Sequence, residues 1–142
     1  MKHSILMVAG GALALSLPGA AMADAVMLSA TLDGASETKG GSPNGSGTFQ
    51  AEVDAESGDL CYVLAVDGIG DAMAAHIHTG AAGHDGKPVV TIEVTGEEED
   101  LCVAVEPDAL KPIIAEPSAY YVNVHTKDFP AGAIRGQLAK SE

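Results

Sequence analysis

The sequence of 142 residues contains no tryptophan, only two phenylalanines and three tyrosines, so Val, Leu, Ile and Ala must fill the hydrophobic core. Basic residues are also few, because seven Lys and Arg stand against 20 Asp and Glu, and the formal net charge is −13. Such a chain is a poor partner for nucleic acid or an anionic membrane, since both recognise Lys and Arg. Its acidic surface favours solubility and remains compatible with divalent cations.

Long apolar runs are absent except near the N-terminus, where residues 5–17 are followed by Ala21-Met22-Ala23. A short polar start, an apolar run and an Ala-x-Ala site are typical of a signal peptide. We therefore expect residues 1–23 to be cleaved and residues 24–142 to form one domain without a membrane span, in a periplasmic or secreted protein. Retention of the first segment as an uncleaved anchor is the alternative.

Cysteine occurs only at positions 61 and 102, and each residue lies in a strand-like phrase. In an exported chain, the simplest arrangement is one disulfide between Cys61 and Cys102. A thiolate site for copper or zinc is the competing interpretation, which the lack of a Cys-x-x-Cys motif weakens.

Short apolar runs, separated by Gly, Pro, Asn and Asp, predict seven or eight strands. The expected strands are 25–32, 48–54, 60–66, 74–79, 88–94, 101–105, 119–126 and 133–139. Residues 108–115, bounded by Pro107 and Pro117, are expected to form a short helical segment. This pattern indicates an all-β, antiparallel sandwich or barrel with Greek-key connections.

Three histidines lie in two of these expected strands, His76 and His78 in the first and His125 in the second. Side chains alternate between the two faces of a strand, and the aliphatic residues between the histidines claim the core. The three imidazoles should therefore share the opposite face, together with Asn123 and Arg135. We expect this to be a polar outer face.

A His-x-His on one strand with a third histidine on another strand is a recurrent way to present imidazoles to copper or zinc. We expect His76, His78 and His125 to bind copper, with zinc as the alternative ion. His84, Met73, water or a substrate could supply the fourth ligand. Two other interpretations remain open: the histidines form a hydrogen-bonded network that holds loops together, or they are exposed and unrelated.

Arg135, the only arginine, and Asn123 are the residues expected to support the ligands. Arg135 could hold an anionic group beside the histidines. A lone arginine in a strand more commonly pairs with a carboxylate, and Asp128 or Glu52 are the expected partners.

Three longer phrases resemble the chordin-type (CHRD) domain: His-Ile-His-Thr-Gly-Ala-Ala-Gly at 76–83, Tyr-Tyr-Val-Asn-Val-His-Thr at 120–126 and Phe-Pro-Ala-Gly-Ala-Ile-Arg-Gly-Gln-Leu at 129–138. The resemblance implies an immunoglobulin-like β-sandwich, related in architecture to copper/zinc superoxide dismutase, over residues 24–142. In chordin such domains belong to an extracellular protein that binds growth factors. Residues 84–88 depart from the usual turn of the family, so the resemblance gives no role to His84.

Two functions are compatible with these observations. The first is an exported metal-binding module that stores, buffers or delivers copper. The second is an extracellular protein- or glycan-interaction module in which the histidines are structural. We do not expect an enzyme, because four histidines after residue 23 are too few for a copper and a zinc site together, and no Gly-x-Ser-x-Gly motif occurs.

Overall fold

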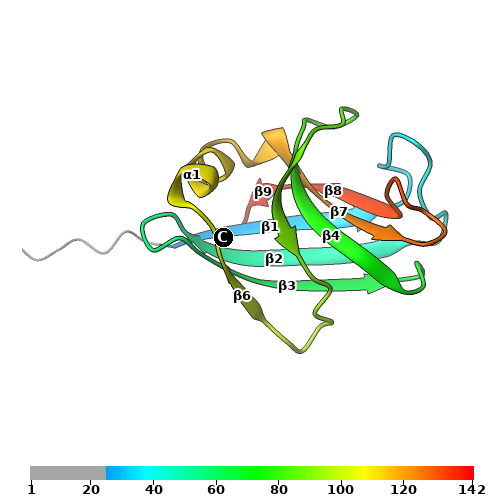
Figure 1. The fold of residues 1–142 in the computed structure, drawn as a ribbon, viewed down its shortest axis with the longest axis horizontal. Helices are drawn as coiled ribbons and strands as arrows, with labels where there is room; N and C mark the ends of the chain where they lie inside the picture. Colours follow the sequence, from blue (N-terminus) through cyan, green and yellow to red (C-terminus); the bar gives the residue numbers. More distant parts are fainter. Residues whose placement is uncertain (1–24) are drawn as a thin grey trace, which may run out of the picture.

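The computed structural model describes residues 25–142, and the expected signal peptide lies outside this part of the chain. The described residues form nine strands, one α-helix and one 3-10 helix (Figure 1). The strands are β1 (Val26–Asp33), β2 (Ser46–Asp54), β3 (Asp59–Asp67), β4 (Ala72–Thr79), β5 (Pro88–Ile92), β6 (Leu101–Ala104), β7 (Tyr120–Thr126), β8 (Ile134–Gln137) and β9 (Ala139–Lys140). The helices are α1 (Pro107–Ala115) and η1 (Pro117–Ala119).

All strand pairs are antiparallel, which confirms the expected all-β fold with one short helix. Two elements are additional: the 3-10 helix η1, and strand β9, which has two residues and pairs with β1. The segment after β8, expected to continue as one strand to residue 139, is instead interrupted at Leu138.

The strand order is β5-β4-β7-β8-β1-β2-β3-β6 and divides the sheet into two halves. We call β1, β2, β3 and β6 the scaffold half, and β4, β5, β7 and β8 the histidine half. A single residue pair, Asp33 with Arg135, joins β1 to β8. Near the two ends of this strand order, the backbone of Thr95 and Gly96, just after β5, donates hydrogen bonds to the carbonyl oxygen of Leu64 in β3. The sheet therefore nearly closes into a barrel.

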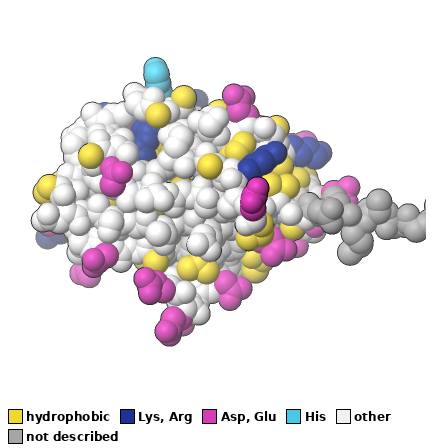
Figure 2. All heavy atoms as spheres, turned by 180° about the vertical axis from the view of Figure 1, so that it is seen from behind, with side chains coloured by type: hydrophobic (Ala, Val, Ile, Leu, Met, Phe, Trp, Pro, Cys, Tyr) yellow, Lys and Arg dark blue, Asp and Glu magenta, His cyan; other side chains and the backbone are white. Residues whose placement is uncertain are grey.

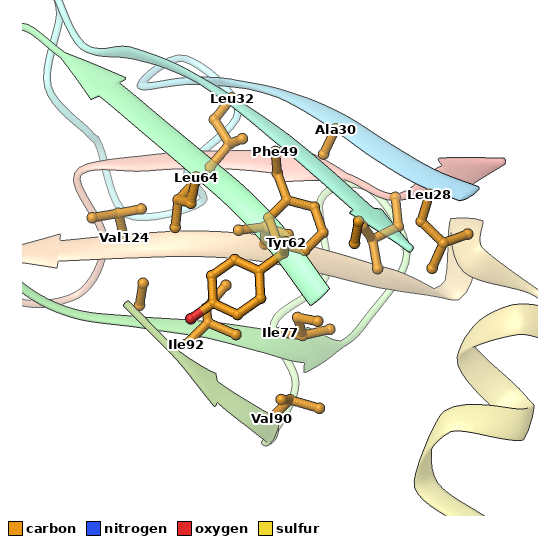
Figure 3. Close-up of a cluster of buried hydrophobic side chains, with 14 of the residues drawn as sticks. Leu28, Ala30, Leu32, Phe49, Tyr62, Leu64, Ile77, Val90, Ile92 and Val124 are labelled. Atoms are coloured by element: carbon orange, nitrogen blue, oxygen red, sulfur yellow. The ribbon is translucent and has the colours of Figure 1, made fainter. Parts of the chain in front are cut away.

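Inward-facing side chains of both halves meet in one core (Figure 3). In β2, buried and exposed residues alternate from Thr48 to Val53, as expected for a strand with one face on the core. Tyr62 stacks on Phe49 and also accepts a hydrogen bond from the backbone of Glu93 through its hydroxyl group. Helix α1 closes one end of the core with Leu110 and Ile113, which are fully buried.

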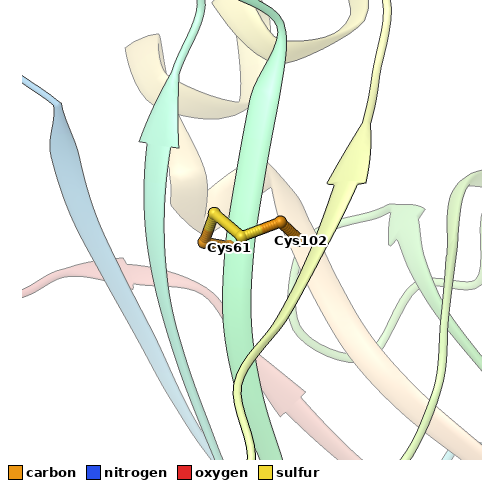
Figure 4. Close-up of a disulfide and its surroundings, with 2 residues drawn as sticks. All are labelled: Cys61 and Cys102. Carbon is orange, nitrogen blue, oxygen red and sulfur yellow. A yellow bond between two sulfur atoms is a disulfide. The ribbon is translucent and has the colours of Figure 1, made fainter.

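The expected disulfide between Cys61 and Cys102 is confirmed (Figure 4). The two residues are directly opposite each other in the pairing of β3 with β6. The bridge thus fastens the short edge strand β6 to the scaffold half. It also removes both thiols from any metal site.

Many acidic side chains of the described residues are exposed. On the face shown in Figure 2, acidic side chains lie scattered rather than gathered in one patch. Among residues 25–142 no helix has the length and apolar character needed to cross a membrane.

Candidate metal centre

The pairing of β4 with β7 brings the three histidines together. His125 lies opposite Ala74, and Asn123 lies opposite His76, so His125 is a diagonal neighbour of His76. The ring centroid of His76 is 5.4 Å from that of His78 and 5.3 Å from that of His125. One ligand atom from each residue lies within 4.8 Å of the other two, so the group could hold a metal ion. The predicted convergence is confirmed.

The face that carries the histidines is not the outer surface that the strand pattern predicted. Two segments, residues 34–45 and 80–87, contribute contacts to it, and we call them the cover loops. Beneath them Asn123 is 3% exposed and Arg135 is 1% exposed, while His78 is 9% exposed. His76 and His125 keep partial access to solvent. The site is therefore a polar layer that is partly covered and partly accessible to solvent.

Two of the imidazoles are oriented by backbone carbonyl groups. Nδ1 of His78 lies 3.0 Å from the carbonyl oxygen of Gly86, and Nδ1 of His125 lies 3.0 Å from that of Pro130. A carbonyl oxygen only accepts, so Nδ1 must carry the proton in both rings. In the neutral ring, Nε2 then holds a free lone pair. Metal-bound histidines are commonly oriented in this way.

The environment of the cluster favours neutral imidazoles. Burial lowers the pKa of His76 below its ordinary value of 6.5, and the neighbouring His125 and His78 add to the effect. Burial also lowers the pKa of His78, although its hydrogen bond to Gly86 opposes the shift. Neutral imidazole is the form that binds metal ions.

Arg135 supports the layer, but with a partner other than those predicted. Its guanidinium lies 3.4 Å from the centroid of the Tyr121 ring and donates to Asp85 at 3.2 Å, so the expected pairing with Asp128 or Glu52 is wrong. It also donates to the carbonyl oxygens of Ala81 and His84, at 3.0 and 2.7 Å. Arg135 therefore fastens the second cover loop.

Glu37 is a residue of the site that the sequence did not reveal. Nδ2 of Asn123 donates to its Oε1 at 2.8 Å, across 86 positions of the chain. Burial raises the pKa of Glu37, and the hydrogen bond from Asn123 and the charge of Arg135 oppose the shift. In the sequence, the only feature that could have indicated Glu37 is its position as a carboxylate within a loop rich in Gly and Ser.

Of the two candidate fourth ligands among the side chains, His84 is not part of the group of three, and Met73 is largely exposed. His84 is exposed, with Nδ1 3.2 Å from the carbonyl oxygen of Ala82. Met73 is 70% exposed and is the extra residue of a β-bulge, where the register with β7 shifts between Ala72 and Ala74. Bulges of this kind often accompany functional sites because they re-aim side chains.

Comparison with known proteins gives one finding. The family model described as the CHRD domain matches residues 28–138, which is most of the chain. No curated protein and no solved structure matches this chain.

Proposed function

Because the chain belongs to the CHRD domain family, a group of extracellular-type modules, we propose that it is an exported protein that binds copper through His76, His78 and His125. The bound ion would be stored, buffered or delivered. Zinc is the alternative ion, since neutral imidazole suits both metals.

One observation carries this proposal. Among residues 25–142, four buried side-chain atoms have no hydrogen-bond partner in the protein, and all four lie in this cluster: Nδ1 of His76, Nε2 of His78, Nε2 of His125 and Oδ1 of Asn123. An unpaired buried polar atom costs about 1–3 kcal/mol, so folded proteins seldom retain several of them together. A metal ion would satisfy the three nitrogens at once.

The partial exposure of His76 and His125 supports a role in handling the ion rather than in holding it permanently. Copper is favoured over zinc because a given set of nitrogen ligands binds Cu²⁺ more tightly. An enzyme of the copper/zinc superoxide dismutase type is not proposed, since residues 25–142 contain one such group rather than two.

Equilibrium dialysis of the untagged protein against Cu²⁺ and Zn²⁺ tests the proposal. We expect one ion per chain, and loss of that ion in His76→Ala and in His125→Ala. His84→Ala is the matched control, because it removes an exposed histidine of the cover loop. Thermal unfolding verifies that each variant is folded. A wild-type protein that stays metal-free, or a His76→Ala variant that binds as well as wild type, would contradict the proposal.

A second function, an interaction module with structural histidines, is favoured by a different observation. The bonds from His78 to Gly86 and from His125 to Pro130 hold loop backbone in place without any ion. In that case a protein or glycan partner from an envelope extract should be retained after the histidines are replaced. Capture that a chelator abolishes would argue against this function.

A further inference from the structure

We propose that Asn123 supplies the fourth donor of the metal centre with its side-chain oxygen, and that Glu37 fixes the amide in the orientation that presents it. The inference rests on the proposed function and goes beyond it, because it assigns an N3O donor set. Such a set should favour the divalent ions Cu²⁺ and Zn²⁺ over Cu⁺ as the cargo.

The position of Asn123 places its amide among the histidines. On β7 it shares a face with His125, two residues away, and the strand register puts it opposite His76 on β4. The side chain is buried, and its Oδ1 has no hydrogen-bond partner among the described residues. The unpaired oxygen therefore belongs to the cluster.

The orientation of the amide follows from Glu37. A carboxylate oxygen only accepts hydrogen bonds, so the amide must turn its NH2 group to Oε1 of Glu37. Gly132, with φ of 143°, passes so near this bond that a Cβ atom at position 132 would collide with both Glu37 and Asn123. The backbone thus leaves the pair little room to rearrange, and Oδ1 remains directed away from Glu37.

Three acceptor atoms of the cluster receive no hydrogen bond from the described residues. A neutral His78 gives its only proton to Gly86, and His125 gives its own to Pro130, so both Nε2 atoms are acceptors. Oδ1 of Asn123 is a third acceptor in the same layer. One water molecule donates two hydrogen bonds and cannot satisfy all three, whereas a cation attracts every lone pair around it. The arrangement is therefore complementary to a metal ion.

The donor types determine which ion is preferred. An amide oxygen is a hard ligand, which suits divalent ions, whereas thioether and thiolate ligands select Cu⁺. Both cysteines are joined in the disulfide, and the sulfur-bearing side chain of Met73 is largely exposed. With three imidazoles and one oxygen, we expect the centre to bind Cu²⁺ and Zn²⁺ and to gain nothing from Asn123 when Cu⁺ is bound.

The test compares Asn123→Leu, which keeps the approximate volume without the polar atoms, with wild type. Zn²⁺ affinity is expected to fall by at least about tenfold, because loss of even a group that only supports a metal ligand typically costs about tenfold to a hundredfold. Cu⁺ affinity, measured by competition with a chromophoric chelator, should remain unchanged.

Two further variants keep the test decisive. Glu37→Gln releases the amide from its fixed orientation and should weaken Zn²⁺ binding in the same direction, even if Asn123→Leu does not fold. Gln50→Leu is the matched control, a polar-to-apolar change at an exposed position of β2 in the scaffold half. It should leave every affinity unchanged.

The outcomes separate this inference from the proposed function. If Asn123→Leu binds Zn²⁺ as wild type does while His76→Ala does not, only the donor assignment is overturned. Equal losses for Zn²⁺ and Cu⁺ would also overturn it, since they would indicate a general structural role. A wild-type protein that binds neither ion would refute the proposed function itself.

Discussion

The two halves of the sheet differ in regularity. In the scaffold half, β1 pairs with β2 through eight consecutive residue pairs and β2 with β3 through nine, without interruption. In the histidine half, β4 changes register against β7 at Ala72 and Ala74, and against β5 at Ile77 and His78. Both irregularities adjoin the histidines. Departures from ideal pairing are therefore confined to the half that carries the candidate site.

The two halves also differ in what lies on their non-core faces. The scaffold half exposes side chains such as Gln50 and Glu52 to solvent and carries the disulfide. The histidine half has cover loops, a buried arginine and all four unpaired buried atoms. Regular pairing and a covalent bridge stabilise the domain in one half. This allows the other half to retain a polar layer that is unfavourable without an ion.

The largest expected effect is a loss of stability when the shared core is changed. The same kind of change should affect Zn²⁺ binding in only one of the two halves. Leu64→Ala in β3 and Ile77→Ala in β4 each remove a fully buried aliphatic side chain, so each should destabilise the ion-free protein by about 2–5 kcal/mol. Only Ile77→Ala should also weaken Zn²⁺ binding, because Ile77 lies between His76 and His78. Urea unfolding and Zn²⁺ titration of the folded fraction measure the two effects. Equal losses of affinity would show that the halves are not independent.

Removing the disulfide should give the next largest effect. The bridge spans 41 residues, and replacing Cys61 and Cys102 together by Ser should lower the free energy of unfolding by about 3–4 kcal/mol in the chain-entropy description. Below the unfolding transition, Zn²⁺ affinity should match that of wild type, because the bridge lies in the scaffold half. A weakened affinity in fully folded protein would contradict the division of roles.

Arg135→Lys tests how strongly the cover loop supports the site. Lysine keeps the charge but cannot reproduce the fork that reaches Asp85, Ala81 and His84 together. We expect a loss of about 1–3 kcal/mol in stability, the usual consequence of unpaired buried groups. Zn²⁺ affinity should also fall, since Gly86 of the same loop orients His78. Proteolysis within residues 80–87, compared with wild type, provides an independent measure of loop opening.

Local pattern predicted the parts of the molecule that depend on neighbouring residues. Alternation along each strand placed His76, His78 and His125 on one face, and the structure brings them together. The same reasoning could not show that this face is covered, because the partners are distant in the chain. Asp85 lies 50 positions from Arg135, and Glu37 lies 86 from Asn123. No periodicity encodes such pairs, so Arg135 was assigned the wrong carboxylates and Glu37 was missed.

The smallest expected effect is a pH dependence that arises in the histidine half. The pKa values of His76 and His78 are lowered on folding, mainly by burial, so below pH 6.5 the unfolded chain binds more protons than the folded one. The stability contributed by their neutral forms is therefore present above pH 6.5 and is lost as the pH falls through the lowered pKa values. Glu37 acts in the opposite direction, because its raised pKa reduces stability as the pH rises above 4.5.

Urea unfolding of the ion-free protein between pH 5 and pH 7, in the presence of chelator, should isolate the histidine contribution when two variants are compared. His76→Gln removes one of the depressed groups, so its stability should rise less steeply with pH than that of wild type. His84→Gln, at the exposed position in the cover loop, should follow the wild-type curve, and Glu37 affects all three proteins alike. An unchanged slope in His76→Gln would mean that burial does not hold this imidazole neutral. The cluster would then have to release protons before binding an ion, and ion affinity would fall steeply below pH 6.5.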